Sequence, residues 1–402
     1  MLKGNLIYGQ SGGPSSVINA SAYGVISEAL KSDLIENVLV MKNGISGILN
    51  NEYYVENDFI EDLELLKNTP ASAFGSVRYK LKSYIEDIHD FEIIHDFFKN
   101  NNIRYFLYNG GNDSMDTCVK LSEYMNHVDY DVKIIGIPKT IDNDLPSTDH
   151  TPGFGSAAKY IINTLMEINR DMAVYPRSKV TIVEIMGRHA GWLTASSMVA
   201  KQSGTGPDLI YVPEVAFDID DFLVKVENIY NKKQSCLIAV SEGIKDHQGY
   251  FVGLNSDFKD AFGHNQLGGV AMKLGELVKA KLKIDYRSIE LSTTQRAASH
   301  LRSKTDVLEA IEVGRHGVLF ALQGYTNKMV TINRTSNKDY HIEYGIEDTF
   351  KIANKEQVIP NHMFDENNNL NDEFYRYILP LINGEYPQIY ENGVQKFFKI
   401  KQ

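Results

Sequence analysis

The sequence has few cysteines and no long hydrophobic run. Only Cys118 and Cys236 occur among its 402 residues, and both lie in apolar stretches. Two cysteines exclude a disulfide framework and a cysteine-rich zinc site, so we expect both thiols to be buried. No run of about 18 apolar residues occurs, and the first residues lack a signal-peptide pattern. We therefore expect a cytoplasmic protein that does not bind membranes.

The sequence also lacks an excess of basic residues. Its 41 lysines and arginines against 52 aspartates and glutamates give a net charge of -11. This balance argues against non-specific nucleic-acid binding, and no basic patch with interleaved aromatic residues is visible. An anionic ligand would need basic residues that are gathered at one place.

Strand-like and helix-like segments alternate over most of the chain. This alternation predicts an α/β fold with two doubly wound, Rossmann-like domains and mostly parallel sheets. No linker rich in proline, glycine and serine separates the domains, so we expect the chain to cross between them more than once.

Several local patterns predict particular elements. Asn43-Gly44 predicts the turn of a hairpin. Pro14 suits the first position of a helix, whose free backbone amides would attract an anion. Residues 308–324 predict a helix that runs into a strand, and residues 328–335 and 341–346 predict added β structure.

Segment 105–145 carries the strongest functional signal. It reads twice as an apolar strand that breaks into a polar turn, first at residues 109–114 (the NGGNDS turn) and then at residues 138–145 (the PKTIDNDL turn). Ligands of open α/β sheets bind at the carboxyl ends of parallel strands. Small residues let the backbone approach an anion, and acidic groups can hold a metal or accept a proton.

These turns could bind a polyphosphate together with residues 11–14 (SGGP, the glycine turn) and Arg78. Backbone amides, a guanidinium group and a metal held by Asn or Asp side chains would surround its charge. Asp142 could accept the proton of an attacking hydroxyl while Asp144 helps to hold Mg²⁺, or the reverse.

Basic residues further along the chain fit the same chemistry. Lys139 and Arg188 would offset charge on a transferring phosphoryl group, and Lys179, Arg287 and Arg296 could bind a phosphate on the acceptor. Each signal alone also has a structural explanation: an ordinary βα loop, a solvated basic surface or, for Glu214 and Glu242, an acid at a helix N-terminus. Spacing alone leaves these alternatives open.

The motifs occur in the order seen in 6-phosphofructokinases, which the chain therefore resembles from residue 5 to residue 296. The segments that carry the resemblance are GQSGGPSSVINA, FGSVRYK, YNGGNDS, PKTIDNDL, VEIMGRHAGWLT, AVSEG and TTQR. Residues 327–334 and 372–387 are similar to the longer, pyrophosphate-dependent branch of that family.

The resemblance implies a reversible phosphoryl transfer from pyrophosphate to the 1-hydroxyl of fructose 6-phosphate, with Mg²⁺ as cofactor. It implies that residues 1–153 plus about 295–345 bind the donor. Residues from about 154 to 294 plus 346–402, which include a C-terminal extension, would bind the sugar phosphate across a cleft. A homodimer with active sites near the subunit interface is expected, and a tetramer is the alternative.

The resemblance also implies residue roles. Asp142 would be the base that activates the hydroxyl, with Thr140 beside it, and Arg188 would stabilise the transition state together with Lys139. One or more basic groups of the sugar-phosphate site would come from a neighbouring subunit. The donor-site residues are Gly12, Gly13, Arg78, Asp113, Ser114 and Lys139, and the sugar-phosphate residues are Thr140, Asp142, Lys179, Met186, Gly187, Arg188, Glu242, Arg287, Thr293 and Arg296.

Two positions favour pyrophosphate over ATP. ATP-dependent members of the family have GGDGS and PGTIDND, whereas this chain has Asp113 and Lys139 in place of the two variable glycines. Asp113 would repel the α-phosphate of ATP, and Lys139 could neutralise an oxygen of pyrophosphate. Asn112 stands where relatives carry a metal-binding Asp, so the metal would bind Asn112, Asp113 or Asp144.

Thr293 stands where short bacterial members have a histidine that contacts the sugar phosphate. Three alternatives stay open at this point. They are an ATP-dependent 6-phosphofructokinase, a catalytically silent regulatory subunit of the same fold, and a related kinase that acts on sedoheptulose 7-phosphate.

Overall fold

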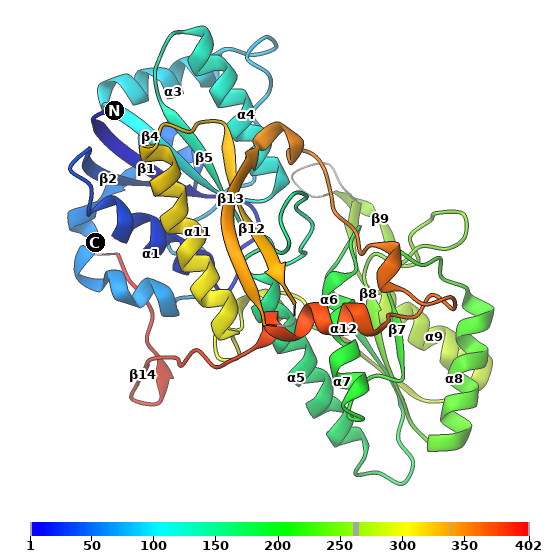
Figure 1. Ribbon diagram of the computed structural model, residues 1–402. Helices are drawn as coiled ribbons and strands as arrows, with labels where there is room; N and C mark the ends of the chain where they lie inside the picture. The colour runs from blue at the N-terminus through cyan, green and yellow to red at the C-terminus, as the bar shows by residue number, and fades with distance from the viewer. Residues whose placement is uncertain (1, 260–264, 338, 401–402) are drawn as a thin grey trace.

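The computed structural model describes residues 2–259, 265–337 and 339–400. Two separate sheets, each flanked by helices, form the two halves of the molecule (Figure 1). The predicted α/β class with mostly parallel sheets is confirmed. Within the described ranges, no helix is long and apolar enough to cross a membrane.

The larger sheet has seven strands in the order β13-β12-β5-β4-β1-β2-β3. Its five central strands run parallel, and the edge strands β13 and β3 are antiparallel to their neighbours. The central strands are apolar runs that are buried along much of their length, as expected for a sheet covered on both faces. The strands are β1 (Gly4–Gln10), β2 (Ile35–Met41), β3 (Tyr53–Val55), β4 (Ile103–Gly110), β5 (Lys133–Pro138), β12 (Lys328–Ser336) and β13 (His341–Asp348).

Helices cover both faces of the larger sheet. One face packs against α1 and α11, and the other packs against α2, α3 and α4. Two glycines bring α1 and α11 into backbone contact, because a Cβ on Gly24 or Gly314 would lie about 2 Å from a carbonyl oxygen of the other helix. The helices are α1 (Ile18–Ala29), α2 (Ile45–Leu49), α3 (His89–Asn100), α4 (Asn112–His127) and α11 (Lys304–Leu322), with 3-10 helices η1 (Glu56–Asp58) and η2 (Ile60–Asn68).

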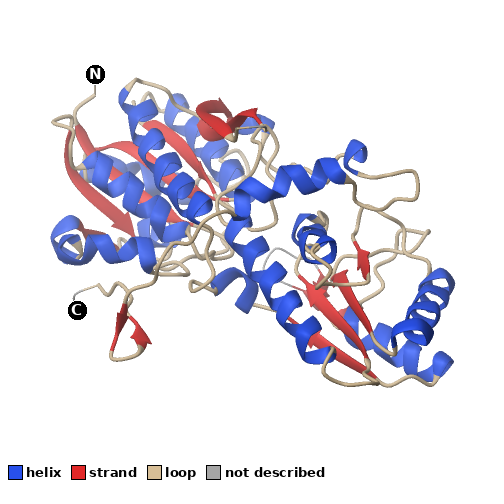
Figure 2. Ribbon diagram, turned by 60° about the horizontal axis from the view of Figure 1, so that its bottom comes forward, coloured by secondary structure: helices blue, strands red, loops and turns tan. Residues whose placement is uncertain are grey.

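The smaller sheet has four parallel strands in the order β11-β6-β8-β7. Helices α5, α6, α7 and α12 cover one face, and α8 and α9 cover the other (Figure 2). Its strands are β6 (Val180–Ile185), β7 (Leu209–Tyr211), β8 (Cys236–Ser241) and β11 (Tyr286–Glu290), and its helices are α5 (Phe154–Met172), α6 (Trp192–Ser196), α7 (Met198–Gln202), α8 (Ile219–Lys233), α9 (Val270–Leu282) and α12 (Asp372–Ile378).

The chain passes between the halves repeatedly. After β11 it returns through α10 (Thr294–Ala297) and α11 to place β12 and β13 in the larger sheet. It then goes back to the smaller half, where α12 packs, and Phe398 finally packs against Phe74 of the larger half. The remaining elements are the hairpins β9 (Leu254–Lys259) with β10 (Asn265–Leu267) and β14 (Tyr390–Glu391) with β15 (Val394–Gln395), and the 3-10 helices η3 (Thr349–Lys351), η4 (Asn361–Met363) and η5 (Leu379–Ile382).

Three local predictions were wrong. Helix α1 begins at Ile18 and not at Pro14, so the glycine turn is a loop of its own. Asn43 and Gly44 have positive φ, but they lead into α2 before β3 pairs with β2. Residues 308–322 are entirely helical because Val313, Val318 and Ala321 share one buried face of α11. The predicted β structure after residue 327 and the burial of both cysteines are confirmed.

Candidate functional site

One polar cavity of about 190 Å³ brings the glycine turn and both polar turns together. These turns follow β1, β4 and β5, which are neighbours in the larger sheet, so their carboxyl ends open at the same edge. All six predicted donor-site residues line this one cavity. The cavity is lined by Ser11, Gly12, Gly13, Arg78, Tyr79, Gly111, Asn112, Asp113, Ser114, Lys139, Thr140, Asp142 and Asp144.

Asn143 shapes the PKTIDNDL turn. Its φ of 56° lies in the left-handed region, which Asn adopts more readily than most residues. Its buried side chain donates from Nδ2 to the Tyr377 hydroxyl at 2.9 Å and accepts from the Thr151 amide at 3.0 Å. These two bonds hold the turn while Asp142 and Asp144, on either side of Asn143, line the cavity.

Lys139 joins the PKTIDNDL turn to the glycine turn. Its side chain is buried, and Nζ donates a hydrogen bond to the Gly13 carbonyl oxygen at 2.6 Å. Burial lowers the pKa of the Lys139 ammonium to about 8, although the carboxylates of Asp142 and Asp144 raise it. At neutral pH Lys139 is therefore a cation whose charge is poorly screened by water.

The two acids of the turn have raised proton affinity. Burial raises the pKa of Asp142, against the lowering effect of Lys139, Arg296 and Arg188. Burial also raises the pKa of Asp144 to about 7, and the charge of Asp142 adds to that effect. A carboxylate of this kind is a suitable proton acceptor near neutral pH.

Asp144 fits a metal better than Asn112 does. Within the described part of the chain, the Asp144 Oδ1 atom is buried and accepts no hydrogen bond. The Asn112 amide oxygen already accepts from the Asp113 amide at 2.8 Å, and its Nδ2 donates to the Lys355 carbonyl at 3.3 Å. Residues 2–259, 265–337 and 339–400 contain no group of three or more His, Cys, Asp or Glu side chains that could hold a metal. Mg²⁺ commonly binds one or two carboxylates plus substrate phosphates, and Asp144 beside Asp142 fits that pattern.

Residues 186–191, the arginine turn, belong to the smaller half and bring the charge of Arg188 near Asp142. The turn follows β6, and Gly187 has a φ of 140° that excludes other residues without strain. The Gly187 amide donates to Glu242 Oε1 at 3.3 Å, and burial raises the pKa of Glu242 to about 7. The charge of Arg188 lowers the pKa of both Asp142 and Glu242, so the arginine turn lies near these two acids.

Arg296 approaches the same site from α10. A Cβ placed on Gly13 would lie 3.2 Å from Arg296 Nη1, so the guanidinium group lies against the glycine turn. Gln295, the preceding residue, accepts a hydrogen bond from the Met186 amide at 3.2 Å. Thr293 is exposed at the start of α10.

Lys179 and Arg287 are not brought together with the other predicted sugar-phosphate residues. Lys179 precedes β6 and Met186 follows it, so at about 3.3 Å per residue they are roughly 20 Å apart. Arg287 is paired in register with Thr181 at that same amino-terminal end, and its guanidinium group lies 3.5 Å from Asp171. Within one chain, these two cations therefore lie far from the cavity.

The alternative explanation that Glu214 and Glu242 are acids at helix N-termini does not hold. Helix α8 begins at Ile219 and is capped by Asp218, and the element that follows Glu242 is strand β9. Glu214 Oε1 instead accepts from the Gly191 amide at 2.8 Å and from the Ile359 amide at 3.1 Å. Both glutamates hold loop backbone in place.

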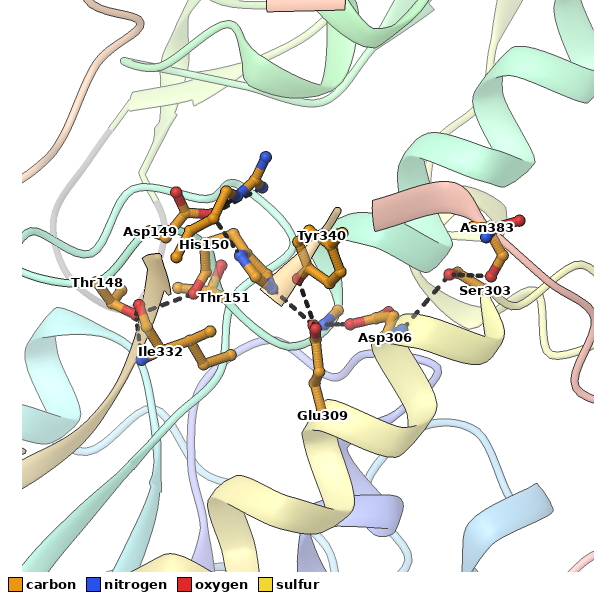
Figure 3. Close-up of polar contacts among 12 residues, drawn as sticks. Thr148, Asp149, His150, Thr151, Ser303, Asp306, Glu309, Ile332, Tyr340 and Asn383 are labelled. Atoms are coloured by element: carbon orange, nitrogen blue, oxygen red, sulfur yellow. Dashed lines mark hydrogen bonds and ion pairs between the residues drawn. The ribbon is translucent and has the colours of Figure 1, made fainter. Parts of the chain in front are cut away.

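A buried charged network supports the chain that follows the PKTIDNDL turn (Figure 3). The His150 ring lies between Asp149 Oδ2 and Glu309 Oε2, each at 2.7 Å, and the Tyr340 hydroxyl donates to Glu309 at 2.5 Å. The neighbouring Thr151 hydroxyl donates to the Thr140 carbonyl at 2.8 Å, which links the network to the site.

The same network sets the charge of the histidine. Burial lowers the pKa of His150, but the carboxylates of Glu309 and Asp149 outweigh this effect and raise it to about 9. His150 is therefore a buried cation between α11 and the segment that follows the PKTIDNDL turn.

Two residues near the site were not identified from the sequence. Gln295 lies within the TTQR motif, which gave a signal for Arg296 only. Glu356 raises the pKa of both Asp142 and Asp144, yet it follows them by more than two hundred positions in a polar stretch without a motif. Its Oε2 atom lies 4.0 Å from His189 Nδ1 of the arginine turn.

Comparison with known proteins gives a consistent family. The model described as "Phosphofructokinase" matches residues 5–320. The pyrophosphate–fructose 6-phosphate 1-phosphotransferases of Halomonas elongata and of Xanthomonas campestris pv. campestris are each 41% identical to this chain, over 100% of it and 97% of the relative.

Solved structures agree with this result. The pyrophosphate-dependent phosphofructokinase of Nitrosospira multiformis is 37% identical, with a TM-score of 0.90 over 99% of this chain and 96% of that one. The match to the family model covers the glycine turn and both polar turns, which line the cavity, and also the arginine turn and α10. The chain belongs to the phosphofructokinase family.

Proposed function

We propose that the protein reversibly transfers a phosphoryl group from pyrophosphate to the 1-hydroxyl of fructose 6-phosphate, giving fructose 1,6-bisphosphate. The observation that carries this proposal is the presence of Asp113 and Lys139 in one cavity with the acids of the PKTIDNDL turn. Full-length relatives at 41% identity carry the name of this activity. The reaction belongs to glycolysis and gluconeogenesis, and we place it in the cytoplasm.

The cavity suits a short, highly charged donor. The larger half would bind pyrophosphate through the glycine-turn amides, Arg78 and Lys139, and Ser114 lies at the same wall. Asp113 adds a carboxylate at that wall. It would repel an additional phosphate of ATP at a cost of about 4 kcal/mol for two charges 4 Å apart at an effective dielectric constant near 20.

Asp142 is the proposed base. Its carboxylate takes the proton of the 1-hydroxyl as the sugar oxygen forms a bond to the nearer phosphorus of pyrophosphate. The bond between that phosphorus and the bridging oxygen breaks, and phosphate leaves. Thr140 lies beside the base. Its hydroxyl accepts a hydrogen bond from the Asp142 amide at 3.1 Å and holds the main chain of the turn.

Lys139 and Arg188 lie where charge develops. Lys139 lines the cavity in the larger half, and the charge of Arg188 from the smaller half lowers the pKa of Asp142, so both cations would flank the transferring group. Asp144, with Asn112 as the weaker candidate, would hold Mg²⁺, which neutralises phosphate oxygens when it is bound.

The sugar phosphate would bind on the side of the smaller half. Met186 and Gly187 belong to the arginine turn, and Glu242 accepts a hydrogen bond from Gly187. Arg296 lies in α10, and Thr293 directly precedes that helix. Lys179 and Arg287 would serve the site of a neighbouring subunit, because they lie at the opposite end of their sheet. This placement supports a homo-oligomer, either a dimer or a tetramer.

A paired donor assay tests the proposal. The purified protein is given fructose 6-phosphate and Mg²⁺ with either pyrophosphate or ATP, and product is measured in both directions. We expect turnover with pyrophosphate and little with ATP. Turnover with ATP alone would contradict pyrophosphate as the donor. No turnover with either donor would contradict the proposed activity, and preferential use of sedoheptulose 7-phosphate would contradict fructose 6-phosphate as the acceptor.

A further inference from the structure

Residues 355–359, here called the strap, lie beside the site between η3 and η4. Two main-chain contacts attach the strap to the larger half. The main-chain N–H of Gln357 donates to the Asp144 carbonyl at 2.7 Å, and Asn112 Nδ2 donates to the Lys355 carbonyl at 3.3 Å. The strap therefore contacts both the PKTIDNDL turn and the NGGNDS turn.

The same segment is attached to the smaller half. Trp192 Nε1 donates to the Gln357 carbonyl at 3.0 Å, and the Ile359 amide donates to Glu214 Oε1 at 3.1 Å. The main chain of Gln357 thus donates a hydrogen bond to the larger half and accepts one from the smaller half. A tether of this kind resists a change in the distance between the halves.

Glu214 connects the strap to the arginine turn. The oxygen that accepts from Ile359 also accepts from the Gly191 amide at 2.8 Å. Gly191 is packed closely here, since a Cβ on it would lie 2.5 Å from Glu214 Oε2 and 2.6 Å from Val212 Cβ. In the described part of the chain, Glu214 Oε2 is buried and has no hydrogen-bond partner. Burying a carboxylate oxygen without a hydrogen bond lowers the stability of the fold, unless the hydrogen bonds of the other oxygen offset that cost.

We propose that the strap fixes the arginine turn relative to the PKTIDNDL turn, and that Glu214 is the positioning residue that anchors it. The inference rests on the proposed function, because it concerns the alignment of Arg188 with Asp142. These two residues come from different halves, so contacts and chain connections between the halves set their separation. The alignment of reacting groups contributes strongly to rate, and a shift of about 1 Å can cost about 100-fold.

The strap is held by specific bonds on one side and borders empty space on another. A cavity of about 330 Å³ lies beside it and is lined by Trp192, Gln357, Pro360 and Tyr377 among others. Ile359, at the end of the strap, is 1% exposed and packs in the core of the smaller half, so this packing holds that end while the hydrogen bonds to Trp192 and Glu214 orient the main chain. Removing the anchor should loosen the main chain of the strap without unfolding either half.

Three variants of Glu214 and its neighbourhood test the inference. Glu214→Ala removes both accepted hydrogen bonds, and Glu214→Gln keeps an oxygen that can accept them. Asp218→Ala removes a carboxylate whose partners, the Asp221 amide and His247, lie in the same half. We expect Glu214→Ala to lower kcat by about 10- to 100-fold with the KM for pyrophosphate within about threefold. Glu214→Gln should restore most of the rate, and Asp218→Ala should leave it unchanged.

Trp192 provides a readout that needs no substrate. It is the single tryptophan of the chain, it is buried, and its indole N–H donates to the strap. Release of the strap in Glu214→Ala should let water replace the Gln357 carbonyl and shift the emission maximum to the red, whereas Glu214→Gln should keep the native emission. Far-UV circular dichroism establishes that each variant is folded, and if Glu214→Ala is not, Trp192→Phe carries the test through a selective loss of kcat.

The outcomes distinguish a failure of the positioning role of Glu214 from a failure of the proposed function. Native emission in a folded Glu214→Ala variant, or a loss of pyrophosphate affinity as large as the loss of kcat, would overturn the positioning role. If the unmodified protein does not use pyrophosphate, the proposed function fails. The emission of Trp192 would still report whether Glu214 anchors the strap.

Discussion

The ammonium group of Lys139 donates a hydrogen bond to the carbonyl oxygen of Gly13 at 2.6 Å, and this bond joins the ends of β5 and β1 across β4. A buried cation is thereby held at the glycine turn before any phosphate arrives. Its position explains why one residue can serve both donor choice and charge stabilisation.

The charge state of Lys139 predicts a pH limit on donor binding. Its pKa is lowered to about 8 by burial, so the cation is present below that pH and is lost above it. We expect kcat/KM for pyrophosphate to fall as the pH rises through about 8, because this parameter reports ionisation of the free enzyme.

Lys139→Arg is the matched control for that profile. Arginine stays charged across the range, so the alkaline fall should disappear even if the rate at neutral pH is lower. An unchanged alkaline fall in the arginine variant would assign the titration to another group.

Asp142→Asn should remove the base and leave the binding surface nearly intact. We expect kcat to drop by about 100- to 10,000-fold, the usual contribution of general base catalysis. Direct titration with fructose 6-phosphate should give a dissociation constant within about tenfold of the original. A near-normal rate would show that Asp142 does not accept the proton.

Asp113→Gly combined with Lys139→Gly should relax the choice of donor. Removing the carboxylate relieves repulsion of a longer phosphate chain, and removing the ammonium group weakens pyrophosphate binding. We expect the ratio of kcat/KM for ATP over pyrophosphate to rise by at least about 100-fold, or about 2.8 kcal/mol. Asp116→Asn, in α4 but outside the cavity lining, should not change that ratio. If the double variant still excludes ATP, other residues determine the donor.

The His150 network predicts a loss of stability in alkali. In the folded protein Glu309 and Asp149 raise the pKa of His150 from its usual value of 6.5 to about 9. The protonated histidine therefore stabilises the fold fully below about pH 6.5, and this stabilisation is lost as the pH rises through 9. The shift corresponds to roughly 3 kcal/mol. Urea unfolding should show that the free energy of unfolding decreases between pH 6 and pH 10. His150→Gln should remove this dependence on pH, and His300→Gln, at an exposed position, should retain it.

The sequence predicted those parts of the site that local patterns determine. Apolar runs that end in polar turns predicted β4 and β5, and their neighbourhood in a parallel sheet followed from the fold class. Residues such as Asp113, Lys139 and Asp142 therefore line one cavity as expected. The same reasoning misplaced the start of α1, because Pro14 is compatible with both a helix start and a loop.

Contacts between distant segments could not be predicted in this way. Glu356 reaches the acids of the PKTIDNDL turn only because the tail after β13 returns to the junction of the halves. Glu214 has the sequence context of a helix-start acid, yet its partners are the amides of Gly191 and Ile359. Such roles depend on tertiary placement, on which a window of adjacent residues carries no information.

The order of strands in the larger sheet also governs how the protein can fold during synthesis. β5 ends at Pro138, but its partner β12 begins only at Lys328. At about 5–20 residues per second, the ribosome would leave the hydrogen-bonding edge of β5 unpaired for roughly 10–40 s. An open strand edge is a template for wrong pairing, so the nascent chain passes through an interval in which it needs protection from aggregation. The smaller sheet, whose strands all lie between residues 180 and 290, is the first that can be completed, although the larger one begins first.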